Sequence, residues 1–315
     1  MIAALLDRLR QGDRNALARL ISHAARGEHL AEMMAGFLAR SSGIGVADEG
    51  NWPRAARVIA FTGSGGVGKS TLIGKLIPIV REEGRKVAVL ACDPQSPLSG
   101  GALLGDRFRI GSPVDDGIFI RSLAAVSGHA AVADHLEMII RLLEAFGFDV
   151  ILLETAGSGQ GDVEVRNLAD IVVLLLQPES GDDVQWEKAG ILECANVIVI
   201  HKADLPGAEQ TADQVCAALE LSPQKSVSVL RVSTKANAGH VELWRAIQAM
   251  PLRHRQASAA RLLYQLTDDW LRERFRAAQD RHDATLVKLV NAWEHGDLAA
   301  RDAAQALLSF LATMK

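Results

Sequence analysis

The segment from Gly63 to Ser70 has the spacing GxxxxGKS/T of a phosphate-binding loop. Its glycines would let backbone N–H groups approach a polyphosphate closely, and the start of a following helix would add partial positive charge. Lys69 can reach the β- and γ-phosphates of a nucleotide, and the Ser70 hydroxyl can bind Mg²⁺. We therefore predict a nucleoside triphosphate site that contains Mg²⁺. Its predicted nucleotide-binding residues are Gly63, Ser64, Gly65, Gly66, Val67, Gly68, Lys69, Ser70 and Thr71.

A second motif, His201-Lys202-Ala203-Asp204, ends the apolar segment Val197–His201 and resembles the NKxD element by which G proteins select guanine. A carboxylate at Asp204 can accept hydrogen bonds from guanine N1–H and N2–H₂, which adenine lacks, and the Lys202 stem can cover the ring. Asparagine is usual where this chain has His201, so a histidine N–H would have to provide the bracing contact. The alternative interpretation is a strand-end turn with solvated charges.

Acidic residues provide candidate Mg²⁺ ligands. Glu154 ends the apolar segment Val150–Glu154, where Mg²⁺-binding acids of P-loop proteins lie, and would approach the ion directly or through water. Gly157 would give the backbone room to sense a γ-phosphate, and the glycine-rich residues after it resemble a mobile switch. Asp93 and Asp106 could hold Mg²⁺ or the attacking water, or could be turn residues. The candidate metal ligands are Ser70, Asp93, Asp106 and Glu154, and the candidate catalytic residues are Lys69, Asp93, Asp106 and Glu154.

The elements that would position these residues alternate between short apolar segments and helical ones. Several segments are apolar throughout, as strands buried on both faces should be, and helices are predicted between them, for example over Lys69–Glu83 and Ala131–Phe146. Repeated strand–helix units imply a mainly parallel sheet with right-handed crossovers. The predicted fold is α/β, a three-layer P-loop NTPase with helical extensions at both ends. The predicted strands are Arg57–Thr62, Lys86–Ala91, Ile118–Arg121, Val150–Glu154, Ile171–Gln177, Val197–His201 and Val227–Val232.

Helical patterns precede and follow this core in the sequence. We therefore predict three zones, an N-terminal helical extension over 1–54, the P-loop domain over 55–250 and a C-terminal helical dimerisation segment over 251–315. In the first zone apolar residues recur three and four positions apart, and Gly12-Asp13 is typical of a break followed by a helix N-cap. The last zone has apolar stripes and many arginines. It is either a packing helix with a solvated basic face or an oligomer interface that covers the stripes.

The composition limits the possible partners. The chain has 315 residues and a formal net charge of −4, and aromatic residues make up 4% of it. A protein that coats nucleic acid needs more positive charge and more stacking side chains, so we expect no nucleic-acid partner. The cysteines are far apart and odd in number, no apolar run reaches the length of a membrane span, and no signal-peptide core is evident. We therefore expect a cytoplasmic protein without a membrane partner.

Taken together, these motifs resemble the MeaB/ArgK family of P-loop GTPases, which belongs to the SIMIBI class. The resemblance extends over almost the whole chain and includes the phosphate loop, Arg10–Arg19, Val87–Pro94, Gly100–Arg107 and Gly181–Ile191. Members of this family are GTPase chaperones of adenosylcobalamin-dependent acyl-CoA mutases, chiefly methylmalonyl-CoA mutase. The resemblance therefore implies a Mg²⁺-dependent enzyme that binds GTP and GDP and hydrolyses GTP slowly. It would gate cobalamin loading and protect or reactivate a mutase.

The resemblance also implies roles for particular segments. Asp93, Asp106 and Glu154 would surround Mg²⁺ and the γ-phosphate, with Asp106 on switch I and residues 155–164 as switch II. The segment Gly181–Lys188 would be a switch III that contacts the mutase, and the C-terminal helices would form a homodimer. Outside the phosphate loop, the nucleotide-binding residues would be Gly157, His201, Lys202, Asp204, Ser233 and Thr234.

Several residues depart from the family pattern where nucleotide and client would be sensed. His201 replaces asparagine, Gly66 replaces a common proline, Ala156 and Ser158 replace valines, and Gln95–Leu98 replaces the usual polar entry to switch I. We infer that the client could be a sister enzyme, such as 2-hydroxyisobutyryl-, isobutyryl- or ethylmalonyl-CoA mutase.

Three other functions remain as alternatives. A nickel or cobalt metallochaperone GTPase would need a metal-collecting cluster, whereas the histidines here are scattered. A ParA/MinD-like ATPase carries an extra lysine early in the loop, where this chain has Ser64. An amino-acid transport kinase would need a second substrate pocket, and no residues in the sequence indicate one.

Overall fold

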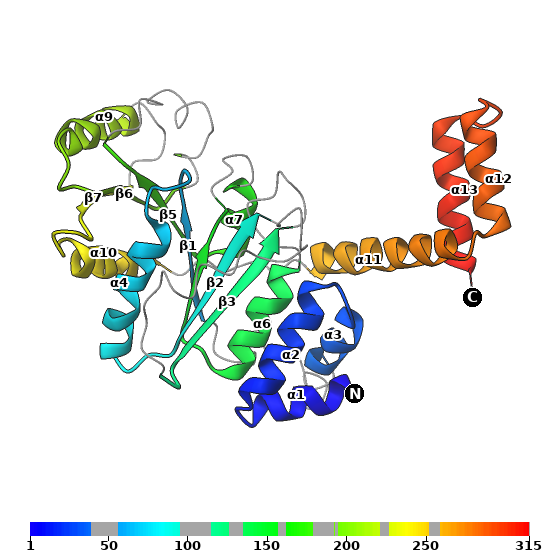
Figure 1. Cartoon of the computed structure of the whole chain (residues 1–315), viewed down its shortest axis with the longest axis horizontal. Coiled ribbons are helices and arrows are strands. Elements are labelled where there is room, and N and C mark those ends of the chain that lie inside the picture. Colours follow the sequence, from blue (N-terminus) through cyan, green and yellow to red (C-terminus); the bar gives the residue numbers. More distant parts are fainter. Residues whose placement is uncertain are drawn as a thin grey trace. The chain divides into compact units, whose positions relative to one another are not determined.

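The structure is a computed structural model and describes residues 1–38, 56–94, 115–125, 135–156, 162–178, 192, 195–220, 227–251 and 259–314. The chain divides into two compact units, Met1–Arg255 and Gln256–Lys315. The larger unit contains a sheet with helices around it, and the smaller unit is helical (Figure 1). The zone boundary drawn after residue 250 stays a prediction, and the one after residue 54 lies outside the described residues.

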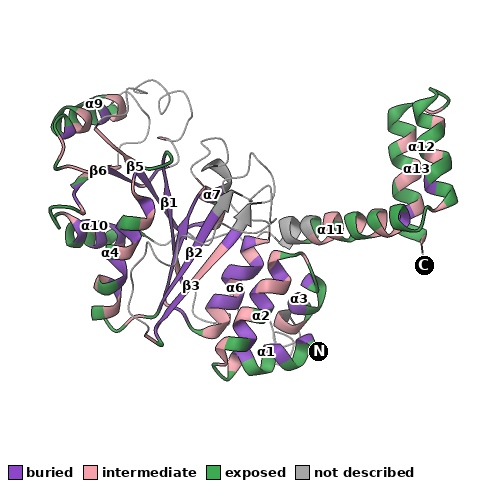
Figure 2. Ribbon diagram, viewed as in Figure 1, coloured by how far each residue is buried: buried purple, intermediate pink, exposed green. Residues whose placement is uncertain are grey.

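The sheet of the larger unit has seven strands in the order β3-β2-β4-β1-β5-β6-β7, and every neighbouring pair is parallel. The predicted α/β class and all seven predicted strands are confirmed. The central strands are buried on both faces, which explains why their sequences are continuously apolar (Figure 2). The strands are β1 Arg57–Thr62, β2 Val87–Pro94, β3 Ile118–Ala125, β4 Val150–Glu154, β5 Ile171–Leu176, β6 Val197–His201 and β7 Ser228–Val232.

Two predicted strands were too short at their carboxyl ends. β2 continues to Pro94 and β3 to Ala125, because Cys92–Pro94 pairs with Leu123–Ala125 beyond the apolar part of each segment. The extension carries the backbone of Asp93 into the sheet, at the edge where the phosphate loop leaves β1.

Helices cover both faces of the sheet. α4 (Lys69–Glu82) and α10 (His240–Ala249) pack side by side on one face (Figure 1). Right-handed crossovers place α6 (Leu136–Phe146), α7 (Asp162–Leu168) and α9 (Ala208–Glu220) on the other. Alternate residues of the central strands pack into two hydrophobic cores, one on each face of the sheet. This arrangement confirms the three-layer prediction.

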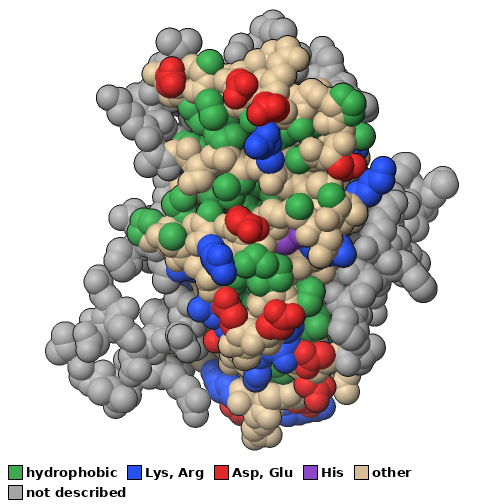
Figure 3. All heavy atoms as spheres, turned by 90° about the vertical axis from the view of Figure 1, so that its left-hand side faces the viewer, with side chains coloured by type: hydrophobic (Ala, Val, Ile, Leu, Met, Phe, Trp, Pro, Cys, Tyr) green, Lys and Arg blue, Asp and Glu red, His purple; other side chains and the backbone are tan. Residues whose placement is uncertain are grey.

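The surface around α9, β7 and α10 mixes acidic, basic and apolar side chains (Figure 3). The part of this face that the structure describes shows no continuous basic patch of the kind that contacts nucleic acid.

Three helices precede the sheet, namely α1 (Ile2–Arg10), α2 (Arg14–Ala25) and α3 (Leu30–Leu38). The predicted break at Gly12-Asp13 is confirmed, since the Asp13 side chain accepts hydrogen bonds from the backbone of Asn15 and Ala16. The leucine and isoleucine side chains of α1 and α2 are buried, and α2 packs on α6. These helices therefore form part of the larger unit's core.

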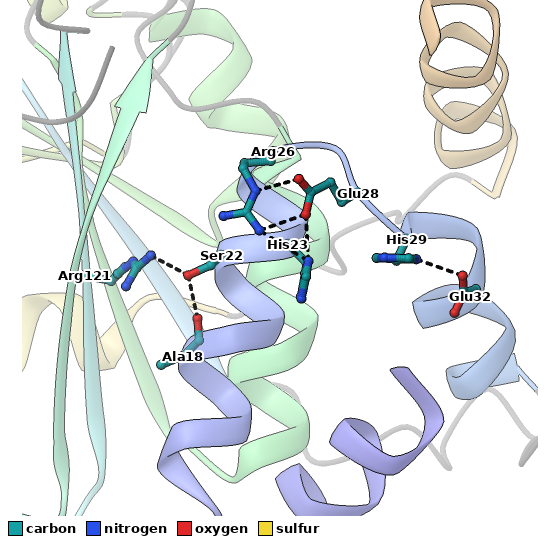
Figure 4. A network of polar contacts seen from close by, with 8 residues as sticks. All are labelled: Ala18, Ser22, His23, Arg26, Glu28, His29, Glu32 and Arg121. Atoms are coloured by element: carbon teal, nitrogen blue, oxygen red, sulfur yellow. Dashed lines mark hydrogen bonds and ion pairs between the residues drawn. The ribbon is translucent and has the colours of Figure 1, made fainter. Parts of the chain in front are cut away.

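α2 also holds the edge strand β3. Arg14 donates to the backbone carbonyls of Asp116, at 2.9 Å, and of Ile118. Arg121 of β3 donates to the Ser22 hydroxyl at 2.8 Å, and that hydroxyl donates to the Ala18 carbonyl (Figure 4). Covering an edge in this way keeps it from pairing with another chain.

A network of polar side chains lies at the C-terminal end of α2. Glu28 accepts hydrogen bonds from the Arg26 guanidinium and contacts His23, and these hydrogen bonds, chiefly that from Arg26, lower the pKa of Glu28 to about 2 (Figure 4). His29 contacts Glu32 beside it. The connection from α2 to α3 is thereby fixed by side chains rather than by apolar packing alone.

The smaller unit consists of α11 (Ala259–Asp280), α12 (Ala284–Glu294) and α13 (Ala300–Thr313). Arg274 joins α11 to α13 by donating to the Leu311 carbonyl, and its guanidinium lies 4.2 Å from the centre of the Trp270 ring. Most of the surface of these helices is exposed (Figure 2). Among the described helices, none combines the length and apolar character needed to cross a bilayer.

Candidate nucleotide-binding site

The loop after β1 has the backbone geometry that its glycines permit. Gly63 has φ +137° and Gly68 has φ +102°, values that other residues rarely adopt. A Cβ on Gly63 would lie 2.4 Å from the Leu175 carbonyl oxygen, and one on Gly68 would lie 2.5 Å from the His201 ring. Both positions therefore require glycine, and together they shape a loop whose backbone can approach phosphate oxygens.

Lys69, the first residue of α4, curls back over this loop. Its side chain is buried, and its ammonium donates to the carbonyls of Gly63, at 2.8 Å, and Ser64, at 3.1 Å. A positive charge enclosed by the loop is placed to meet the negative oxygens of a bound polyphosphate.

Ser70 and Glu154 meet at the carboxyl edge of the sheet. The Ser70 hydroxyl donates to Glu154 Oε1 at 2.6 Å, and Glu154 is buried at the end of β4. Glu154 lies opposite Phe61 of β1 and Ala91 of β2 in the pairing register. Two of the four predicted metal ligands are therefore in contact.

The remaining predicted acids are only partly located. The backbone of Asp93 lies in β2, two residues beyond Ala91, and so at the same edge as Glu154. Asp106 and the segment Gly181–Lys188 lie outside the described residues, as do residues 157–161 of the predicted switch II, which include Gly157 and Ser158.

The donors that the structure does describe fit Mg²⁺. A hydroxyl and a carboxylate are hard oxygen ligands, which Mg²⁺ prefers. They stand beside the glycine-rich loop, where a Cβ at Gly63 would clash with the Leu175 carbonyl oxygen. Ser70 and Glu154 would hold the ion, and the ion would supply positive charge to neutralise the phosphate oxygens.

His201 braces the phosphate loop from the end of β6. Its Nδ1 donates to the Val67 carbonyl at 2.7 Å, and its Nε2 lies 2.9 Å from the Thr234 hydroxyl. A carbonyl can only accept, so this assigns the ring proton to Nδ1 and makes Nε2 the acceptor. Burial lowers the pKa of His201, against the opposing effect of the Val67 hydrogen bond. The histidine N–H thus braces the phosphate loop from the end of β6.

Asp204 lies next to the loop that follows β7. Its Oδ1 accepts from the Ser233 hydroxyl at 2.5 Å, and this hydrogen bond lowers the pKa of Asp204. The Ser233 oxygen also accepts from the Ala236 backbone, and an isolated bridge between Ser233 and Ala238 closes the turn. The carboxylate that would read guanine is therefore ionised at neutral pH and held in place.

One polar residue at this edge was not predicted from the sequence. Gln177 directly follows β5, and its side-chain oxygen accepts from the Lys202 ammonium at 2.6 Å. The same ammonium lies 3.2 Å from the Gly66 carbonyl. A polar residue at the carboxyl end of an apolar parallel strand is a signal that could have identified it, because ligands of such sheets bind there.

Comparison with known proteins decides the family. Residues 50–280 match the family described as "Methylmalonyl Co-A mutase-associated GTPase MeaB". The chain belongs to this family. A MeaB-family protein with this phosphate loop is a GTPase, and the chain is accordingly an enzyme that hydrolyses GTP.

Individual relatives agree with this assignment. A Pyrococcus abyssi protein whose name refers to a GTPase is 40% identical over 79% of this chain and 75% of its own length. A fused isobutyryl-CoA mutase from Cupriavidus metallidurans is 35% identical over 65% of this chain and 18% of its own length. The solved structure of an LAO/AO transport system kinase covers 99% of this chain and 98% of its own, with a TM-score of 0.58 and 24% identity. At that identity the likeness shows the fold alone.

Proposed function

We propose that this MeaB-family GTPase is a chaperone of an adenosylcobalamin-dependent acyl-CoA mutase. It would gate cobalamin loading and protect or reactivate the mutase, which is methylmalonyl-CoA mutase or a sister such as 2-hydroxyisobutyryl- or isobutyryl-CoA mutase. One observation carries this proposal: part of the chain aligns with a segment of a fused isobutyryl-CoA mutase. A segment that works within one polypeptide beside a mutase has a natural counterpart in a separate protein that binds one.

The bound nucleotide in this proposal is GTP or GDP with Mg²⁺. Asp204 would accept from the guanine ring and the Lys202 stem would cover it, while Ser233 and Thr234 support the base site through Asp204 and His201. Ser70 and Glu154 would hold Mg²⁺ together with Asp93 and Asp106. Lys69 would stabilise charge on the phosphoryl group as water attacks in line.

The switch in this proposal depends on the client. Intrinsic hydrolysis would be slow, and contact of the mutase with Gly181–Lys188 and residues 155–164 would order the groups that act on the γ-phosphate. The C-terminal helices would join two copies, since apolar side chains on α11 and α12 are exposed in the described part of the smaller unit.

The decisive experiment measures GTP hydrolysis by the full chain with and without purified mutases. Methylmalonyl-, isobutyryl- and 2-hydroxyisobutyryl-CoA mutase are each added at a few micromolar. We expect one of them to raise the rate by about tenfold or more, as partners that complete a GTPase site do. A rate unchanged by all three, with no complex in gel filtration in either nucleotide state, would contradict the chaperone proposal.

A lysine variant tests the site itself. Lys69→Ala should lower GTP hydrolysis by at least about 100-fold, because it removes the charge enclosed by the loop. Lys75→Ala is the matched control, since Lys75 is exposed on the same helix. Hydrolysis at the parent rate by Lys69→Ala would overturn the assignment of the phosphate loop.

A further inference from the structure

Gln177 stands between the two motifs of the nucleotide site. It follows β5, and β5 lies between β1, which leads into the phosphate loop, and β6, which leads into His201–Asp204. The carboxyl ends of these three strands meet at one edge. A side chain from β5 can therefore reach both motifs.

The Lys202 side chain joins the His201–Asp204 motif to Gln177 and to the phosphate loop. Its ammonium donates to the Gln177 side-chain oxygen at 2.6 Å and to the Gly66 carbonyl at 3.2 Å. The nearer acceptor is thus Gln177. The lysine is stretched from the end of β6 toward the phosphate loop and is held at its far end.

The near end of Lys202 is fixed by its backbone. Its φ is +56°, a left-handed value that a lysine adopts only where its surroundings impose it. The next residue, Ala203, donates to the Val232 carbonyl, and the Lys202 carbonyl accepts from Leu205. Because these contacts fix the Lys202 backbone, the direction of its side chain depends on the groups that bind its ammonium.

We propose that Gln177 is a positioning residue for guanine-nucleotide binding, acting through Lys202. By holding the ammonium, it keeps the aliphatic stem of Lys202 extended as one wall of the base site. This inference rests on the proposed use of that stem to cover guanine. Gln177 itself is given no contact with the nucleotide.

Loss of the Gln177 oxygen should act on the base rather than on the phosphates. Among the described residues, the ammonium would keep only the Gly66 carbonyl, and it would exchange its lost partner for water. A lysine freed in this way samples many rotamers and covers the ring for less of the time. The phosphate loop keeps its own contacts through Lys69, so the effect should appear as faster release of the nucleotide.

The experiment measures dissociation of a fluorescent GDP from the full chain, chased with unlabelled GDP. Gln177→Leu keeps the size of the side chain and removes the acceptor, and we expect release about tenfold faster, the usual cost of losing a hydrogen bond to a charged group. Gln177→Glu keeps an acceptor and should stay within about twofold of the parent. Gln248→Leu is the matched control, because Gln248 bonds only Glu83 in the described structure and lies on α10.

A double-mutant cycle shows whether the effect passes through Lys202. Adding Gln177→Leu to Lys202→Ala should cause no further acceleration. Independent, multiplying effects would overturn the inference, and so would Gln177→Glu releasing GDP as fast as Gln177→Leu. Parent protein that fails to bind GDP would instead refute the proposed function, whereas a parent that binds and a Gln177→Leu variant that releases at the parent rate would refute this inference alone.

Discussion

At the end of β6 a histidine occupies a position where asparagine is usual, and both of its ring nitrogens are engaged. Nδ1 supports the phosphate loop at Val67, and Nε2 contacts Thr234 in the loop after β7. The ring therefore links the two halves of the nucleotide site. With both nitrogens engaged inside the protein, guanine selection would depend mainly on Asp204.

Burial of His201 should make stability fall in mild acid. Its pKa is lowered from 6.5, so below about pH 6.5 the unfolded chain binds a proton that the folded chain resists. The free energy of unfolding should drop as pH falls through this range, by up to about 1.4 kcal/mol per pH unit for each such histidine. His240, whose pKa burial also lowers, adds to the slope. Urea unfolding at pH 7.5, 6.5 and 5.5 measures it.

His201→Asn should flatten that slope, because asparagine does not titrate. The control is His295→Asn, at an exposed histidine of the smaller unit. A His201→Asn slope equal to that of the parent would show that His201 does not carry the pH dependence.

Single residues of the candidate site could be predicted from the sequence where a motif of fixed spacing, or the end of an apolar strand, marks them. Lys69 and Ser70 come from a contiguous motif, and Glu154 from its place at the end of an apolar strand. The link from Gln177 to Lys202 was not predictable, because it depends on β5 and β6 being neighbours in the sheet. All four candidate metal ligands, Ser70, Asp93, Asp106 and Glu154, remain predictions.

Among the elements, α10 depends on a close approach between the glycine at its start, Gly239, and the backbone of β7. Gly239 precedes the helix with φ +84°, and a Cβ there would lie 2.5 Å from the Arg231 carbonyl of β7. The helix start is thus pressed against the strand backbone. α10 carries Trp244 into the core beside α4, so this approach also supports the helix that follows the phosphate loop.

Gly239→Ala should therefore be costly. Backbone strain at positive φ and the clash with a carbonyl should together lower the free energy of unfolding by about 2–4 kcal/mol. Gly147→Ala is a matched control, with φ +95° and no atom near the added Cβ, and should cost about 1 kcal/mol from strain alone. Urea denaturation of both variants measures the difference. Equal losses in the two would show that the contact with Arg231 is unimportant.

Strands were easier to predict than their ends. A run of apolar residues marks a strand buried on two faces, which is why all seven were found from composition and pattern. The ends of β2 and β3 were missed because their last residues are held by pairing with each other, and local composition does not reveal a pairing partner. The attachment of α2 to β3 through Arg14 and Arg121 was hidden for the same reason.

On the scale of the whole molecule, the smaller unit taken by itself exposes several large apolar side chains. Val290 is 38% exposed and Trp293 is 54% exposed on α12, and Trp270 is 41% exposed on α11. The apolar stripes predicted for these helices are present. Sequence pattern revealed them because helical spacing is local.

If two copies meet through these helices, a charge on α12 should separate them. Val290→Glu should convert a dimer into a monomer, because an unpaired carboxylate is costly in an apolar interface. Val241→Glu is the matched control, since Val241 is 44% exposed on α10 of the other unit. Light scattering coupled to gel filtration gives the mass of each. A parent that is monomeric, or a Val290→Glu variant that stays dimeric, would contradict this arrangement.

The strand order has a consequence for synthesis of the chain. β1 lies in the middle of the sheet, yet its neighbours β4 and β5 begin at Val150 and Ile171. A ribosome therefore releases β1 and the phosphate loop long before the strands that support them, and partners so distant in the chain pair slowly. Until Leu176 has emerged, the nascent chain has a phosphate-binding sequence without the strands that flank β1. GTP can therefore stabilise this protein only late in its synthesis.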